Sequence, residues 1–226
     1  MVFTNRPKFN ANGSVPQEYY DADYWEKGAE SGKGSYNGNA YETQLELCKV
    51  WAQDCYNRWG PFKDFLELGC GRGWNIWAYL HMPLLGINPR GVDLSHYAVT
   101  TAVEEVRPYI TEHDASDLSF LGDLSYDTIF SNDFLEHLTP EQAERCLQHC
   151  NRISRHIVAH LISIGDGHDH EVGAYMPEQD QSHVTMKGVD WWLNMFNRVF
   201  NQTDWLLSIK HHGTTVEIVA TRTKPG

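Results

Sequence analysis

Three alternating glycines are the first residues whose spacing points to chemistry. Gly69, Gly71 and Gly73 follow a short apolar run. The acid Glu67 lies two residues before the first of them, and a helical pattern starts at Trp74. A strand, a glycine turn and a helix bring backbone N–H groups close to a ligand. A carboxylate at position 67 can accept hydrogen bonds from a cationic or hydroxylated ligand, whereas it would repel a phosphate.

The glycine spacing separates two classes of cofactor. A dinucleotide fingerprint needs a third glycine three residues after the second. Trp74 or Ile76 stands at that position, depending on which glycine begins the motif. The run 67–73 instead resembles the first motif of the class I S-adenosylmethionine-dependent methyltransferases, and the resemblance extends over residues 65–221. A dehydrogenase is therefore the least favoured of the enzyme classes considered.

The resemblance implies which residues hold S-adenosylmethionine. Asp93 ends the second expected strand, where a carboxylate accepts from the two ribose hydroxyls. Asp93 could instead cap the N-terminus of the next helix, but Ser95 can supply that cap. Asp114 and the backbone of Ala115 are implied for the adenine, with Asp117 as a competing candidate. The residues expected to bind the cofactor are Tyr20, Trp25, Glu67, Gly69, Cys70, Gly71, Gly73, Trp74, Asp93, Leu94, Asp114, Ala115, Asn132 and Asp133.

An aromatic segment precedes the expected fold. Tyr20, Tyr24 and Trp25 lie in it, followed by a Gly/Ser/Lys stretch. A disordered tail is the alternative, although disordered tails carry few aromatic residues. By the family resemblance, we expect residues 1–40 to form an arm over the cofactor, with 33–38 as a lid.

Two histidines are candidates for catalysis. Methyl transfer is an in-line displacement, so the enzyme mainly positions the acceptor. A hydroxyl acceptor must also lose its proton, and histidine can accept it at neutral pH. His137 follows the fourth expected strand and His183 lies in a later loop. Each has a structural alternative: His137 as a hydrogen-bonded histidine of the core, His183 as a residue that ties down the loop.

The loop over residues 165–186 carries three histidines and several acids. Asp133 and Asp166 stand where some methyltransferases hold a divalent ion, and His168 and His170 are nearby. Hard cations prefer oxygen ligands, whereas histidines favour zinc or a transition metal. Because the mixture matches no single spacing, we assign no metal ligands, and a divalent metal stays the less favoured expectation.

The positioning elements follow from hydrophobic periodicity and from the Gly and Pro residues that interrupt it. We expect an α/β fold with a Rossmann-like seven-stranded sheet, mostly parallel with an antiparallel C-terminal hairpin, and helices on both faces. Residues 41–226 would form one domain. The expected strands are 65–68, 90–94, 109–114, 126–133, 156–164, 205–211 and 215–221, and the expected helices are 41–59, 74–81, 95–108, 140–153 and 187–200.

The composition of the chain disfavours nucleic acid and membranes as partners. The 226 residues carry a formal charge of −12, which disfavours nucleic acid. No apolar run is long enough for a membrane span, and the N-terminus lacks the apolar core of a signal peptide. Five cysteines without a CxxC pair favour reduced thiols in the cytoplasm. The oligomeric state stays open.

The residues together predict an S-adenosylmethionine-dependent methyltransferase. We expect a small-molecule acceptor, methylated at a hydroxyl of a sugar or secondary metabolite. Two alternatives remain: a methyltransferase acting on protein or RNA, which a basic groove would favour, and a non-catalytic S-adenosylmethionine-binding module, which a degenerate glycine motif would favour. The sequence has neither feature.

Overall fold

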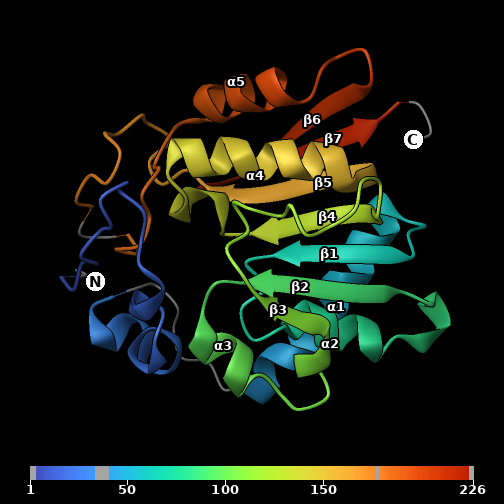
Figure 1. The fold of residues 1–226 in the computed structure, drawn as a ribbon, viewed down its shortest axis with the longest axis horizontal. Helices are drawn as coiled ribbons and strands as arrows, with labels where there is room; N and C mark the ends of the chain where they lie inside the picture. Colours follow the sequence, from blue (N-terminus) through green and yellow to red (C-terminus); the bar gives the residue numbers. More distant parts are fainter. Residues whose placement is uncertain (1–3, 34–40, 177–178, 224–226) are drawn as a thin grey trace.

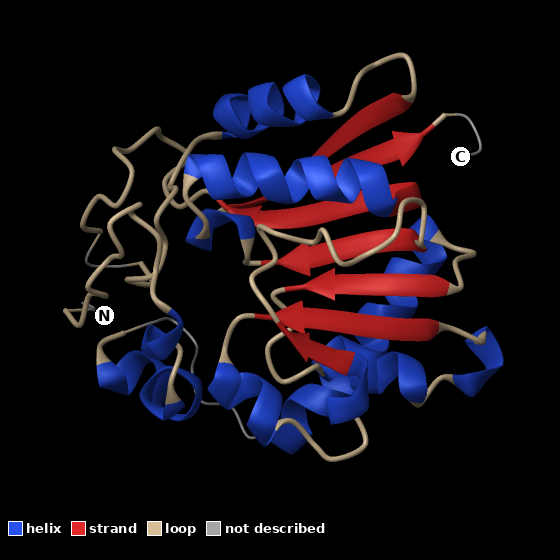
Figure 2. Cartoon of the chain, viewed as in Figure 1, coloured by secondary structure: helices blue, strands red, loops and turns tan. Residues whose placement is uncertain are grey.

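The computed structural model describes residues 4–33, 41–176 and 179–223. In this part of the chain, one seven-stranded sheet has the order β3-β2-β1-β4-β5-β7-β6 (Figures 1 and 2). Neighbours from β3 to β5 are parallel, and β7 runs antiparallel to both β5 and β6. The expected fold class is confirmed. The strands are β1 (Asp64–Leu68), β2 (Asn88–Asp93), β3 (Ile110–Glu112), β4 (Tyr126–Asn132), β5 (Ser154–Ser163), β6 (Trp205–His212) and β7 (Thr215–Arg222).

Helices cover both faces of the sheet and bury two apolar clusters. The helices α4 and α5 pack on one face of the sheet and bury one apolar cluster there. The helices α1, α2 and α3 contribute to the second cluster, on the opposite face. Figure 1 shows α4 in front of β5 and α1 behind the sheet. The helices are α1 (Tyr41–Trp59), α2 (Trp74–Leu80), α3 (His96–Thr101), α4 (Pro140–Ile153) and α5 (Val189–Val199).

Strand β1 lies at the centre of the parallel part because its side chains are apolar on both faces. Phe65 packs into the cluster under α1 and α2, whereas Leu66 and Leu68 pack into the cluster under α4 and α5. A strand buried on both faces reads as a continuous apolar run. This packing fixes the glycine turn at the carboxyl edge of the sheet.

The helix expected over 95–108 is shorter than predicted. Ser95 caps α3 by accepting a hydrogen bond from the Ala98 N–H at 3.0 Å. The helix ends at Thr101, and a short 3-10 helix, Arg107–Tyr109, follows it. The end is set at Ala102, whose φ of −56° and ψ of 153° are not helical. The third strand is correspondingly short, so that Asp114 lies in the turn after it.

Residues 4–33 lie beyond the carboxyl ends of β1, β2 and β4, as the blue segment of Figure 1 shows. Residues 34–38 of the predicted lid fall outside the described residues. All five cysteines are free, in agreement with the expected reduced thiols. No helix in the described ranges has the length and apolarity needed to cross a bilayer.

Candidate active site

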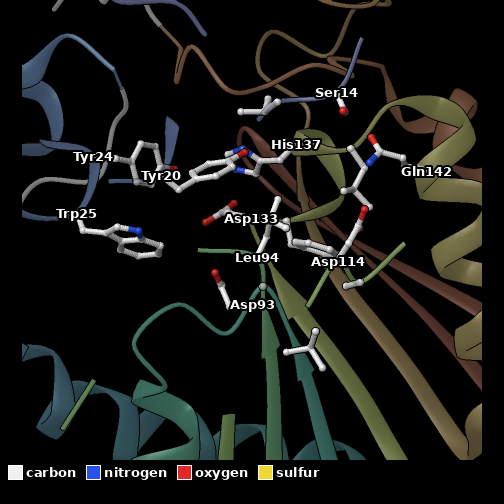
Figure 3. Close-up of a pocket in the computed structure, with 16 residues that line it drawn as sticks. Ser14, Tyr20, Tyr24, Trp25, Asp93, Leu94, Asp114, Asp133, His137 and Gln142 are labelled. Atoms are coloured by element: carbon white, nitrogen blue, oxygen red, sulfur yellow. The ribbon is translucent and has the colours of Figure 1, made fainter. Parts of the chain in front are cut away.

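Two cavities adjoin at the carboxyl edge of the sheet. The first has a volume of about 100 Å³ and the second about 750 Å³. Figure 3 shows the first, with Asp93 and Asp133 directed into one space that Trp25 borders. The two cavities are adjacent, because five residues line both of them: Tyr24, Trp25, Gly69, Asp133 and His137.

The glycine turn adopts a backbone that side chains would disrupt. Gly69, Gly71 and Gly73 have φ angles of +64°, +54° and +73°. A Cβ on Gly71 would lie 2.9 Å from the ring of Trp25, so the turn and the N-terminal segment are in close contact. A Cβ on Gly73 would instead lie 2.5 Å from Val106. Gly69 and Gly71 therefore line the site, whereas Gly73 lines neither cavity and allows close packing.

Asp93 joins the glycine turn to the end of β2. Its carboxylate accepts hydrogen bonds from the Gly71 N–H at 2.7 Å and from the Ser95 N–H at 2.8 Å. Burial raises the pKa of Asp93 to about 6, against the lowering effect of these two donors. The carboxylate faces the first cavity and is ionised at neutral pH, so it can accept further hydrogen bonds from a hydroxylated ligand.

Asp114 and Ala115 line the first cavity beside Leu94. Asp114 Oδ1 accepts from the Ser116 N–H at 2.8 Å, which fixes the turn. Asp117, the competing candidate, lines neither cavity and pairs with the N–H of Ser119. The lining residues that were not predicted include three from distant parts of the chain: Ser14, Val15 and Gln142.

The second cavity contains an acid with an unused oxygen. Glu67 is only 5% exposed, and its Oε1 accepts from the Asn75 side-chain amide at 2.6 Å. Its buried Oε2 has no hydrogen-bond partner. Burial raises the pKa of Glu67 to about 8, against the lowering effect of Asn75. The other predicted cofactor residues on this side are Cys70, Gly71, Trp74, Asn132 and Asp133.

The N-terminal segment is hydrogen-bonded to the start of α3. Trp25 Nε1 donates to Ser95 Oγ at 2.9 Å, and Ser95 Oγ donates to the Tyr20 carbonyl at 2.6 Å. The Tyr24 hydroxyl donates a hydrogen bond to Oδ2 of the buried Asp180 at 3.0 Å. The predicted aromatic residues 20, 24 and 25 thus form one wall of the first cavity.

His137 and His183 come together from distant parts of the chain. Their rings lie 4.6 Å apart, and both line the second cavity. Ser182 donates its only proton to Asp180 at 2.5 Å, so the 2.9 Å contact between His137 Nδ1 and Ser182 Oγ favours the tautomer with a proton on Nδ1, over the longer 3.5 Å contact of Nδ1 with the Tyr20 hydroxyl. When neutral, His137 therefore has its lone pair on Nε2.

Burial keeps both imidazoles neutral at pH 7. It lowers the pKa of His137, with Asp180 and Asp133 acting in the opposite direction. It also lowers the pKa of His183 to about 3, with His137 contributing. Asp133 itself has a φ of +47°, which is uncommon for a residue with a side chain and is often found at functional sites.

Residues 65–156 match a family model described as a methyltransferase domain. These residues therefore form a methyltransferase domain. This confirms the family resemblance drawn from residues 67–73. A search of the curated proteins found no match.

Solved structures share the methyltransferase fold. The N-terminal domain of EvdMO1 with SAH bound is 14% identical with a TM-score of 0.58, over 83% of this chain and 86% of that one. A SAM-dependent methyltransferase from Archaeoglobus fulgidus is 16% identical with a TM-score of 0.57, over 79% and 94%. An O-methyltransferase family protein from Burkholderia thailandensis is 11% identical with a TM-score of 0.59, over 91% and 64%.

The methyltransferase site uses polar residues that the sequence did not single out. Glu136, Asp180 and Ser182 were not among the predicted site residues. The available signal was their position in the sequence, since Glu136 precedes His137 and the other two lie within three residues of His183. In contrast, Asp166 pairs with His170 at 3.0 Å, away from both cavity linings.

Proposed function

We propose that this methyltransferase transfers a methyl group from S-adenosylmethionine to a hydroxyl of a small molecule. The observation that carries the proposal is the adjacency of the two cavities, which share five lining residues. A glycine turn and the carboxylate of Asp93 border one side, and a histidine pair borders the other. Two structural neighbours support this cofactor: the N-terminal domain of EvdMO1 with SAH bound and the SAM-dependent methyltransferase from Archaeoglobus fulgidus.

The residues present fit the proposed cofactor at both of its ends. The buried, unpartnered Oε2 of Glu67 is suited to an ammonium group. Asp93 is suited to the vicinal ribose hydroxyls, and Asp114 with the Ala115 backbone to the adenine. The nucleoside would occupy the first cavity, and the methionine part would extend along Glu67 and Gly71 into the second.

The chain's contribution to the reaction is mainly positional. When bound, the cofactor supplies an electrophilic methyl carbon on a sulfonium. Asp93 and Glu67 would orient it from two sides, and the aromatic wall would exclude water. His137 and His183 are the groups proposed to promote loss of the acceptor's proton. Imidazoles can do this as bases or by holding a cation beside the oxygen.

The acceptor side favours a compact, uncharged or cationic molecule. The N-terminal segment encloses the cofactor side, and the chain carries a formal charge of −12, which opposes polyanionic substrates. A sugar or secondary metabolite with a free hydroxyl fits these conditions. The structural neighbour from Burkholderia thailandensis, an O-methyltransferase family protein, supports oxygen as the methylated atom.

The test is transfer of isotope-labelled methyl from S-adenosylmethionine to panels of acceptors. The panels should contain sugars, phenols, amines, a protein mixture and RNA. We expect label on small hydroxyl compounds, with release of S-adenosylhomocysteine in equal amount. Label on protein or RNA alone would replace the proposed acceptor class. Cofactor binding without transfer to any panel would favour a non-catalytic module.

A further inference from the structure

Three metal-ligating side chains meet at the edge of the second cavity. Glu136 and His137 lie on the short 3-10 helix Leu135–His137 after β4, and His183 lies in the segment that leads to α5. One ligand atom from each lies within 4.8 Å of the others, and within the described residues this is the one such group. Asp166, His168 and His170, which the sequence suggested as possible ligands, are not members of it.

Glu136 is held in place with one oxygen unused. The residue is fully buried, and its Oε1 accepts from the Ser163 N–H at 3.0 Å. Its Oε2 has no hydrogen-bond partner. Burial, followed by the carboxylates of Asp133 and Asp180, raises the pKa of Glu136 well above its usual value. A buried carboxylate oxygen without a partner is costly, so this position favours a bound cation or donor.

The segment that carries His183 is fixed to Glu136. The N–H groups of Val184 and Thr185 both donate to the Glu136 carbonyl, at 2.8 and 2.9 Å. His183 Nδ1 is buried and has no hydrogen-bond partner. Two of the three side chains therefore present an unpartnered polar atom within one small group.

The hydrogen bonds of His137 match those of a metal-ligating histidine. Such a histidine usually donates its other ring N–H to an oxygen, which fixes the tautomer and ring orientation. Here Nδ1–H donates to Ser182, which in turn donates to the buried Asp180. The lone pair on Nε2 is left available for a cation.

We propose that Glu136, His137 and His183 form a binding site for one divalent transition-metal ion. Two imidazole nitrogens and one carboxylate oxygen favour Zn²⁺ or a neighbouring ion over Mg²⁺, which prefers oxygen ligands. Three protein ligands leave a position open for a water or a substrate oxygen. Because both histidines line the second cavity, that position faces the proposed acceptor side.

The site gives the histidine pair of the proposed function a defined role. With its lone pair on the ion, His137 does not accept the acceptor's proton. The ion instead lowers the pKa of a bound hydroxyl, and the proton leaves to water. This role rests on the proposed function, whereas metal binding is measured without cofactor or acceptor. A failure of either can therefore be recognised separately.

The test is metal binding to the untagged full-length chain after treatment with a chelator. Titration calorimetry with Zn²⁺ and Mg²⁺, and visible absorption with Co²⁺, should be applied to wild type, Glu136→Gln and His183→Gln. His168→Gln is the matched control, because this exposed histidine lies outside the group. Thermal unfolding would verify that each variant is folded. One folded ligand variant, either Glu136→Gln or His183→Gln, is enough for the test.

We expect wild type and His168→Gln to bind one equivalent of Zn²⁺, with Mg²⁺ weaker by about tenfold or more. Loss of a ligand should weaken Zn²⁺ binding by about tenfold or more and remove the Co²⁺ absorption band. Wild type without stoichiometric Zn²⁺ or Co²⁺ binding would overturn the proposal. So would unchanged affinity in folded Glu136→Gln or His183→Gln.

Discussion

At the scale of single residues, Asp93 should make cofactor binding depend on pH. Its pKa is raised to about 6 by burial, and the ionised form accepts the proposed ribose hydrogen bonds. Protonation below that pH removes acceptor capacity. We expect the affinity for S-adenosylhomocysteine to fall by about tenfold between pH 7.5 and pH 5. Calorimetry at both pH values measures this, and Asp93→Asn should bind weakly with a smaller dependence, because only the contribution of Glu67 remains.

Gly73 should matter for stability more than for binding. Its φ is +73°, and a Cβ would lie 2.5 Å from Val106 and 2.7 Å from Ile110. Gly73→Ala should lower the free energy of unfolding by about 2–4 kcal/mol, from backbone strain and overpacking together. Gly86→Ala is the matched control, since its φ is +63° with no atom within 4 Å of the added Cβ.

Urea unfolding measures both glycine variants. The strain alone should cost about 1–2 kcal/mol at Gly86. Equal losses in the two variants would show that the packing around Gly73 is looser than the structure indicates.

At the scale of elements, Asp127 ties the start of β4 to its neighbours. Its carboxylate accepts from the N–H groups of Lys63 and Asp64 and from Arg155 Nε at 2.6 Å. Burial raises the pKa of Asp127, but these donors outweigh it and lower the value to about 2. A carboxyl group whose pKa is lowered by folding stabilises the fold at pH values above its unfolded pKa of about 3.9. This stabilisation is lost as the pH falls toward the folded pKa of about 2.

Asp127→Asn should therefore lose about 2 kcal/mol of unfolding free energy at pH 7. Its deficit relative to wild type should shrink between pH 4 and pH 2, as followed by urea unfolding. Asp123→Asn is the control, because Asp123 pairs with Arg152 while remaining 74% exposed. A loss at Asp123 equal to that at Asp127 would contradict the argument from burial.

Elements were predictable where local chemistry decides them. The Thr139-Pro140 start of α4 was expected, and Thr139 does cap the helix by accepting from the Gln142 N–H. The central strands followed from apolar runs. The length of α3 was overestimated, because the backbone leaves the helical conformation at Ala102, well before Pro108, and no proline or glycine at that point signals the end.

At the scale of the whole molecule, the site is assembled from segments far apart in the sequence. Ser14, Gln142 and Asp114 line one cavity, although no local pattern relates them. The glycine turn and Asp93 were predictable because one motif and one strand end place them. The Glu136–His183 group was not, since its backbone hydrogen bonds depend on how the segment after β5 folds back.

The N-terminal segment should contribute to cofactor affinity, although it lies far from the glycine turn in the sequence. Trp25 contacts the glycine turn and donates to Ser95. Trp25→Ala should weaken S-adenosylhomocysteine binding by about tenfold or more, through lost aromatic contact area. Phe9→Ala is the control, because Phe9 packs against the same N-terminal cluster but lines neither cavity. Unchanged affinity in Trp25→Ala, measured by calorimetry, would show that the aromatic wall does not contact the cofactor.

The most direct test of the central claim is calorimetric titration with S-adenosylmethionine and S-adenosylhomocysteine, using Asp93→Asn as the variant and NAD as competitor. We predict binding of one molecule of either compound per chain, strongly weakened in Asp93→Asn and unaffected by NAD. Absence of binding by the wild-type chain to both compounds would contradict the account.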